Sequence, residues 1–302
     1  WMAHKAVAVA APSYLVWNDF QDDKNRALID DALPSTHPIW TPVATPEEAV
    51  ELFDTITYQK GCATMRMLEN FLGEETFRAG LRSYMQTYAE KNATGPDLWR
   101  ALAQASGLPV GELMHSWVAQ PGFPLITMEL IEGEERLLRV SQRRFFSDPV
   151  AQAADNDQLW RVPLVLRYVD ADGVHEHRHI LSEREGQVRL PGRGPLVVLH
   201  GNADEVGFYR VRYVGALQEA LVREGAARLS AVEQMGLIED TWALVRSAQV
   251  EIGAFVAVLG GFADTRDHNV LRAVTDRLGT LDLLLRAALQ PRGYVFCQFV
   301  NS

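Results

Sequence analysis

Cysteine is scarce in this chain of 302 residues: Cys62 and Cys297 are its two cysteines, and they lie far apart in the sequence. One possible pair in so long a chain is no disulfide framework, so we expect a protein of the reducing cytoplasm. No apolar run approaches the roughly 18 residues that a membrane-spanning helix needs. No basic segment followed by an apolar one opens the chain, as a secretory signal would require. These absences predict a cytoplasmic protein without a membrane partner.

Positive charge is also in short supply. The chain has 29 lysines and arginines against 39 aspartates and glutamates, a formal net charge of −10, and no long basic run. Nucleic acid binding depends on neutralising phosphates with basic side chains, so we expect no nucleic acid partner. An acidic balance favours solubility, and it mildly favours cationic ligands such as free amino termini.

The first 120 residues have apolar positions at helical spacing. Residues 1–11 predict a helix that Pro12 ends. Thr45, Pro46 and Glu48 have the order of a capping box and predict a short helix through Phe53. Further helices are expected over about 56–72, 77–88, 98–107 and 109–120, the first of them ended by Gly73. The chain opens at Trp1, in what the pattern predicts as the middle of a helix, which suggests a fragment.

The pattern changes at Pro121. Short runs rich in valine, leucine and isoleucine follow, separated by turn signals, and they predict a small β-sandwich over about 124–213. Within it, the polar stretch 151–158 is expected to be a loop. From about 215 the pattern is helical again, and Leu229-Ser230 is expected to open the longest helix.

One stretch carries a resemblance to a known family. Residues 53–61 read Phe-Asp-Thr-Ile-Thr-Tyr-Gln-Lys-Gly, and Arg66-Met67-Leu68 follow. They resemble the gluzincin zinc aminopeptidases, the family of alanyl and puromycin-sensitive aminopeptidases. Further similar segments occur in the family's order, ending near residue 250: Trp17, Ser35-Thr36-His37-Pro38, Leu72-Gly73-Glu74-Glu75, Asn92-Ala93-Thr94, Gln120-Pro121-Gly122-Phe123-Pro124, Ser141-Gln142-Arg143-Arg144-Phe145, Gly207-Phe208-Tyr209-Arg210-Val211 and Asp240.

The resemblance implies a multidomain α and β fold. Residues 1–120 would be the α-helical C-terminal half of a thermolysin-like catalytic domain, 121–213 a β-sandwich domain, and 214–302 the truncated beginning of a C-terminal α-helical, superhelical domain. Residues 291–302 resemble nothing in the family.

The resemblance also implies a catalytic residue. The tyrosine of the family's I-T-Y-x-K-G motif, here Tyr58, points into the active site. A phenol suits the stabilisation of an oxyanion because its hydroxyl donates a hydrogen bond and its ordinary pKa is about 10. Without the surrounding motif, Tyr58 reads as an ordinary core or surface tyrosine. Lys60 and Arg66 are expected to be structural ion partners.

The family's zinc site, H-E-x-x-H with a later glutamate, would precede Trp1. We therefore expect Zn²⁺ in the full-length parent, no zinc ligand and no bound zinc in this chain, and no activity of the chain alone. The segment His175-Glu176-His177-Arg178-His179 matches H-E-x-x-H but follows a turn signal among strand-like runs. Histidines four apart lie about 6 Å apart on a helix, whereas on a strand they are about 13 Å apart and cannot share one metal. His-x-His chelation of adventitious metal stays a lesser alternative.

Two functions remain open. The first is a zinc aminopeptidase that releases N-terminal residues from peptides with a free N-terminus, of which this chain is a part. The second is a non-catalytic module that binds peptides or serves in assembly. In both cases the apolar surface of the first helices is expected to be exposed and to favour self-association.

Overall fold

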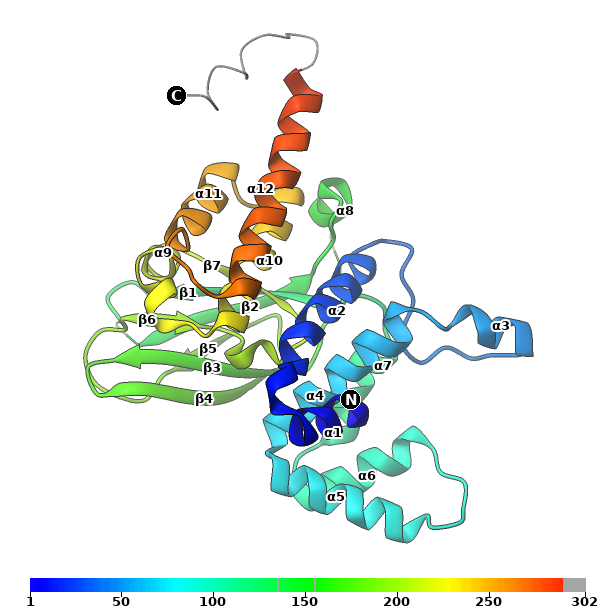
Figure 1. The fold of residues 1–302 in the computed structure, drawn as a ribbon. Helices are drawn as coiled ribbons and strands as arrows, with labels where there is room; N and C mark the ends of the chain where they lie inside the picture. The colour runs from blue at the N-terminus through cyan, green and yellow to red at the C-terminus, as the bar shows by residue number, and fades with distance from the viewer. Residues whose placement is uncertain (135, 155, 290–302) are drawn as a thin grey trace.

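The computed structural model describes residues 1–134, 136–154 and 156–289. Helices come first, then strands, then helices again (Figure 1). The described strands form two small sheets, so the expected mixture of helical segments around a sandwich is confirmed. Cys297 and residues 291–302 lie outside the described residues.

The N-terminal part is helical up to Val118. Its elements are α1 (Met2–Ala10), a 3₁₀ turn (Pro12–Tyr14), α2 (Val16–Asp31), α3 (Pro46–Glu51), η2 (Ile56–Lys60), α4 (Gly61–Leu72), α5 (Glu74–Thr87), α6 (Gly95–Ser106) and α7 (Val110–Val118). Pro12 ends α1 and Thr45 caps α3, as the sequence predicts. The expected continuous α-helix over 56–72 is wrong in its first turn, because η2 is π-helical.

The strands build two facing sheets. They are β1 (Pro124–Leu130), β2 (Leu137–Arg144), β3 (Val162–Asp170), β4 (Gly173–Leu181), β5 (Glu185–Arg189), β6 (Val198–His200) and β7 (Arg210–Tyr213). One sheet has the order β5-β2-β1-β7, in which β1 and β7 are parallel, and the other has the order β4-β3-β6. A 3₁₀ turn, η3 (Ala203–Glu205), lies between β6 and β7.

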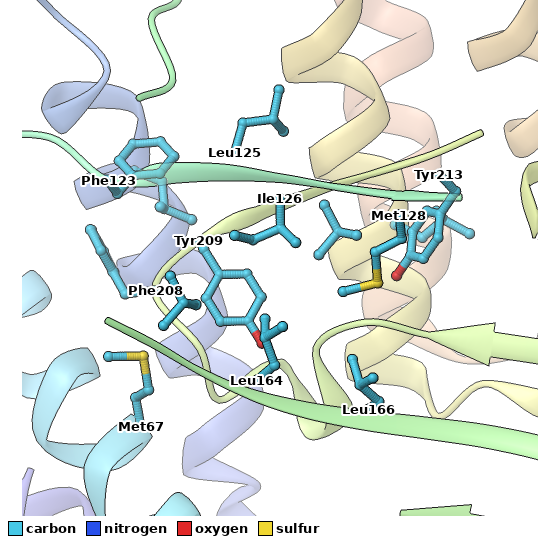
Figure 2. Packing of buried hydrophobic residues seen from close by; sticks show 14 of the residues in the cluster. Met67, Phe123, Leu125, Ile126, Met128, Leu164, Leu166, Phe208, Tyr209 and Tyr213 are labelled. Carbon is cyan, nitrogen blue, oxygen red and sulfur yellow. The ribbon is translucent and has the colours of Figure 1, made fainter. Parts of the chain in front are cut away.

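The core between the sheets is apolar. Ile126 and Met128 of β1 point toward Leu164 and Leu166 of β3, while Leu125 points to the opposite face of its sheet (Figure 2). All five side chains are buried. This alternation is what a strand covered on both faces produces.

One expected loop is partly helical. Residues Pro149–Ala153 form the short helix α8, whose N-cap Asp148 accepts a hydrogen bond from the amide of Val150. The signal Ser147-Asp148-Pro149 suits a turn, and it equally suits a helix start with proline in the first turn.

The C-terminal part consists of α9 (Ala216–Arg228), α10 (Ala231–Arg246), α11 (Ile252–Gly261) and α12 (His268–Leu289). Ser230 caps α10 in a capping box with Glu233, but α10 is not the longest helix as expected: it has 16 residues against 22 in α12. Val270, Val274 and Leu281 of α12 are buried and recur at helical spacing, so α12 has its own apolar face. No helix of the described part of the chain is both long and apolar enough to cross a lipid bilayer.

The parts share one core. The buried cluster runs from Phe20 and Phe77 through Trp117 to the strands and on to Trp242 and Phe255. In Figure 1, α2 lies between the N-terminal helices and the C-terminal ones, and it contacts both η2 and α10. The indole nitrogen of Trp117 donates to the carbonyl of Arg161, 3.0 Å away, which ties α7 to the start of β3.

Candidate active site

Tyr58 lies in the middle of the π-helical turn η2, with its side chain directed to the surface. The residue is 55% exposed, and its ring packs against the exposed ring of Phe53, with centroids 5.7 Å apart. No other described side chain hydrogen-bonds the phenol. Single π-turns are rare in helices and occur frequently at functional sites. The hydroxyl is thus free to donate to a group that approaches from solvent.

The start of the turn is capped by Asp54. Its Oδ1 accepts from the amides of Ile56 and Thr57 at 3.0 and 2.9 Å, and its main-chain carbonyl accepts from the amide of Tyr58 at 3.1 Å. These amides have no partner inside the turn, so Asp54 satisfies donors that would otherwise be left to water.

The second oxygen of Asp54 binds His37, in the loop between α2 and α3. Its Oδ2 lies 2.5 Å from Nε2 of His37, and Nδ1 of the same ring lies 2.9 Å from the carbonyl oxygen of Pro38. Burial alone would lower the pKa of His37, but the bonds to Pro38 and Asp54 outweigh it and raise that pKa. Burial likewise opposes the ionised form of Asp54, and the bonds from Thr57 and His37 prevail, so the pKa of Asp54 is lowered.

The end of the turn is fixed by Lys60. Its side chain is fully buried, and Nζ lies 2.9 Å from Oδ2 of Asp31, the last residue of α2. Nζ also donates to the carbonyl of Gly122 at 3.0 Å, while Oδ1 of Asp31 accepts from the amide of Gly122 at 2.9 Å. Burial lowers the pKa of Lys60, which the nearby carboxylate of Asp31 opposes. Lys60 is therefore a structural ion partner, as the sequence predicts.

The same prediction is wrong for Arg66. No carboxylate among the described residues forms an ion pair with it; its guanidinium instead stacks over the ring of Trp17, 4.5 Å from the centroid. Burial lowers the pKa of Arg66. This cation packs on an aromatic face, an arrangement that sequence spacing does not reveal.

The H-E-x-x-H match lies on a strand. His175, His177 and His179 belong to β4, where they stand opposite Tyr168, Leu166 and Leu164 of β3. Nε2 of His175 lies 2.8 Å from Oδ1 of Asp170, so this ring has a carboxylate partner of its own. The prediction that this segment is a strand is confirmed.

The described residues do not gather a zinc site. Across the described ranges, no group of three histidine, cysteine, aspartate or glutamate side chains lies close enough together to hold a metal ion. The donor chemistry of a protein zinc centre requires at least three such ligands. The arrangement around Tyr58 can therefore supply a hydrogen-bond donor and a rigid support, and no metal-binding step is assigned to these residues.

A cavity of about 900 Å³ opens elsewhere on the helical part, and no sequence pattern predicts it. It lies between α6, α7 and the loop before α3, and its lining includes Trp40, Trp99, Arg100 and His115. Tyr58 does not line it. The volume is in the range of small-molecule sites, but the cavity is separate from the tyrosine turn.

Two family profiles match the chain. The Peptidase family M1 domain matches residues 1–117, which include Tyr58, and the ERAP1-like C-terminal domain matches residues 198–294. The chain belongs to the M1 aminopeptidase family, a family of metallopeptidases.

Curated relatives agree with this assignment. The chain is 33% identical to the puromycin-sensitive aminopeptidase of Caenorhabditis elegans over 93% of its own length and 30% of that protein. It is 31% identical to aminopeptidase M1-A of rice, Oryza sativa subsp. japonica, over 97% of its own length and 33% of that protein. It is 30% identical to tricorn protease-interacting factor F2 of Thermoplasma acidophilum over 94% of its own length and 34% of that protein. The chain spans about a third of the length of these relatives.

Proposed function

We propose that this chain is part of a zinc-dependent aminopeptidase and that Tyr58 stabilises the oxyanion formed during peptide hydrolysis. The observation that carries the proposal is the exposed, unpartnered phenol of Tyr58 on a π-turn that is fixed at both ends. The names of the relatives, which are aminopeptidases, supply the reaction.

The geometry suits a donor that acts in the transition state. An oxyanion-stabilising group works best when it is held in place before the reaction, because no free energy is then spent on orienting it. Asp54 holds the start of the turn and Lys60 holds its end, whereas the phenol itself bonds to no described group. A peptide carbonyl oxygen that gains negative charge could therefore accept directly from Tyr58.

The remaining parts of the mechanism would come from outside the described residues. Zinc supplies Lewis acidity and an activated water when bound in such enzymes. We expect the zinc ligands in the part of a longer protein that precedes Trp1, and we expect the chain alone to be inactive. The substrate would be a peptide with a free N-terminus in the cytoplasm.

The domain organisation that we propose has the divisions 1–120, 121–213 and 214–302. The N-terminal helices end at Val118, and the strands lie between Pro124 and Tyr213, with the short helix α8 and the turn η3 among them. Longer helices resume at Ala216, which supports these divisions. Tyr58 would then belong to the first domain, the helical half of a catalytic domain.

Replacing Tyr58 with phenylalanine in the longer protein tests the catalytic role. The loss of one oxyanion donor typically lowers turnover by about 100- to 1,000-fold. We expect that fall with little change in KM, because the bond would form mainly in the transition state. The matched control is Tyr14→Phe, since Tyr14 is another exposed tyrosine, 70% accessible. Near-normal turnover of the Tyr58→Phe protein at an unchanged thermal midpoint would make Tyr58 a surface residue without a catalytic role.

A second candidate function is a non-catalytic module that binds peptides or assembles through its apolar surface. The observation that favours it is that several apolar side chains on the N-terminal helices and loops are accessible, among them Val9 at 77%, Val50 at 69% and Trp40 at 65% exposure. Accessible apolar side chains gain free energy when a second molecule covers them, so self-association through these side chains is expected. Sedimentation of the unaltered chain is compared with that of a chain in which Val9 and Val50 are both changed to serine. An oligomer that the two substitutions dissociate supports the assembly role, and a monomer in both samples would contradict it.

A further inference from the structure

The loop between α2 and α3 reaches the tyrosine turn through one side chain, that of His37. His37 lies well outside η2 in sequence, and its imidazole contacts the carboxylate that caps the turn. The two oxygens of Asp54 therefore bind different groups: Oδ1 accepts from the amides of Ile56 and Thr57, and Oδ2 contacts the imidazole of His37.

The contacts of the ring fix its protonation. A carbonyl oxygen only accepts hydrogen bonds, so Nδ1, at 2.9 Å from the oxygen of Pro38, must carry a proton. An ionised carboxylate also only accepts, so Nε2, at 2.5 Å from Oδ2 of Asp54, must carry one too. Both bonds exist together only when His37 is an imidazolium, and the pair is then a charge-assisted hydrogen bond.

We propose that His37 is a positioning residue for Tyr58, because its imidazolium holds the Asp54 carboxylate in the orientation that caps the π-helical turn. The proposal rests on the role proposed above for Tyr58, since a precisely held turn matters only if the phenol has a target. His37 touches neither Tyr58 nor any group expected to react; it acts through Asp54.

The charges around the ring agree with this role. Asp54 contacts it directly, and the carboxylate of Asp31 favours its charged form from the end of α2, where that carboxylate is also paired with Lys60. The α2 helix therefore supports both ends of the turn: Asp31 holds Lys60 at the end, and its charge helps to keep His37 protonated at the start.

The proposal has a pH signature. The pKa of His37 is raised above its ordinary 6.5, and that of Asp54 is lowered below its ordinary 3.8. Both side chains are therefore charged in the whole pH range from 3.8 to 6.5. As the pH rises through the folded pKa of His37, the ring loses one proton, its charge and one of its two hydrogen bonds. The turn η2 should then loosen while the following helix α4 stays as it is.

Amide hydrogen exchange of the isotopically labelled chain tests this directly. Protection factors at Ile56, Thr57 and Tyr58, corrected for the intrinsic pH dependence of exchange, are measured between about pH 5 and pH 9, the range in which histidine titrates. We expect protection to fall about tenfold, the size of a lost helix cap, with a midpoint at the pKa of His37 that NMR measures in the same sample. In His37→Gln, which keeps a neutral donor toward Asp54, the profile should be flat.

The matched control is His115→Gln, because His115 is an exposed histidine of α7 and should leave the step unchanged. A wild-type profile without a step, or a His37 pKa at or below 6.5, overturns the proposal, and both are read on the unaltered chain even if His37→Gln fails to fold. None of these readouts uses turnover. Normal turnover of Tyr58→Phe would contradict the proposed role of Tyr58, whereas a flat exchange profile of the wild-type chain would contradict the proposed role of His37.

Discussion

At the scale of single residues, the most costly arrangement near the tyrosine is the buried pair of Lys60 and Asp31. Both side chains are completely inaccessible, and their charged atoms are 2.9 Å apart. Removing two charges from water costs several kcal/mol each, which their attraction offsets only when the remaining bonds are also made. Here Gly122 supplies one acceptor to Lys60 and one donor to Asp31, and Thr36 donates to Asp31 as well.

Breaking that pair from one side should be strongly destabilising. In Lys60→Met the carboxylate of Asp31 stays buried without its cation, and we expect unfolding free energy to fall by about 3–5 kcal/mol, the usual cost of an orphaned buried charge. Urea denaturation followed by circular dichroism measures this. The control is Arg78→Met on α5, which breaks an exposed pair with Glu75 and should leave the midpoint unchanged. Equal effects of the two substitutions would contradict the structural role of Lys60.

The residue scale also shows what the sequence could and could not predict at the candidate site. The motif Ile56-Thr57-Tyr58 pointed to the tyrosine, and Lys60 followed from its place beside it. The sequence assigned no role to His37 beyond its place in a segment that resembles the family, because its partner Asp54 is brought to it by the course of the loop and not by any helical or strand spacing. The one available signal was Asp54 itself, a good N-cap residue three positions before Thr57.

At the scale of elements, α10 packs against the 3₁₀ turn η3 with almost no space between them. A Cβ atom built on Gly236 of α10 would lie 2.1 Å from Oε1 and from Cδ of Glu205. Glu205 is itself buried and bound to Lys24 and His200, so it cannot move aside cheaply. Asp204 and Glu205 both have positive φ angles of 52°, a backbone conformation that side chains disfavour and that close packing must support.

Replacing Gly236 with alanine should therefore destabilise the protein, against the ordinary helix propensity. Overpacking of this kind typically costs about 1–3 kcal/mol. The matched control is Gly279→Ala in the middle of α12, where no atom lies within 4 Å of the added Cβ. That change should stabilise by about 0.5–1 kcal/mol, since alanine favours a helix over glycine. Opposite shifts of the thermal midpoint are the expected result; two upward shifts would mean that α10 and η3 can separate without cost.

Some elements follow from the sequence pattern and others do not. The strands were predictable because β1 and β3 are short apolar runs bounded by turn residues. The helix α2 could not be located by its own periodicity, since it buries Gln21, Lys24 and Asp31 along with its apolar residues. These polar positions are acceptable in the interior only because distant groups bind them: Lys24 donates to Glu205 and Asp31 pairs with Lys60. The identity of such partners is a property of the tertiary fold.

At the scale of the whole molecule, buried polar groups join the three parts of the chain. Lys24 of α2 lies 3.0 Å from Glu205 after β6, and His200 at the end of β6 lies 3.0 Å from the other oxygen of the same carboxylate. Arg210 of β7 binds Asp240 of α10 at 3.0 Å and also reaches Asn25 of α2. The N-terminal helices, the sandwich and the C-terminal helices therefore share titrating groups, and pH should act on all three together.

The directions of the pKa shifts fix the sign of the pH dependence that His200, Asp240 and Glu205 contribute. Burial opposes the charge on His200, but Glu205 and the neighbouring carboxylates Glu233 and Asp240 prevail and raise its pKa above the ordinary 6.5. Stabilisation from His200 is thus complete below pH 6.5 and is lost as the pH rises through the higher folded value. Burial raises the pKa of Asp240 to about 6 from 3.8, so its contribution is already lost above pH 6. Burial would raise the pKa of Glu205, but Lys24 and His200 lower it below the ordinary 4.5. The stabilisation that Glu205 contributes is therefore complete above pH 4.5 and is lost only as the pH falls through the lower folded value.

Unfolding free energy should consequently decline as the pH rises above about 6.5, with His200 as a principal cause and His37 as a second. Urea midpoints measured at intervals from about pH 6 to pH 9 follow this decline. In His200→Gln, an amide donor replaces the titrating ring beside Glu205, so the decline should become shallower, and it should become nearly flat when His37→Gln is added. His268→Gln, at the exposed start of α12, should leave the slope as it is. Equal slopes in the wild type and in His200→Gln would show that His200 is neutral in the folded protein and that Lys24 alone balances the buried charge of Glu205.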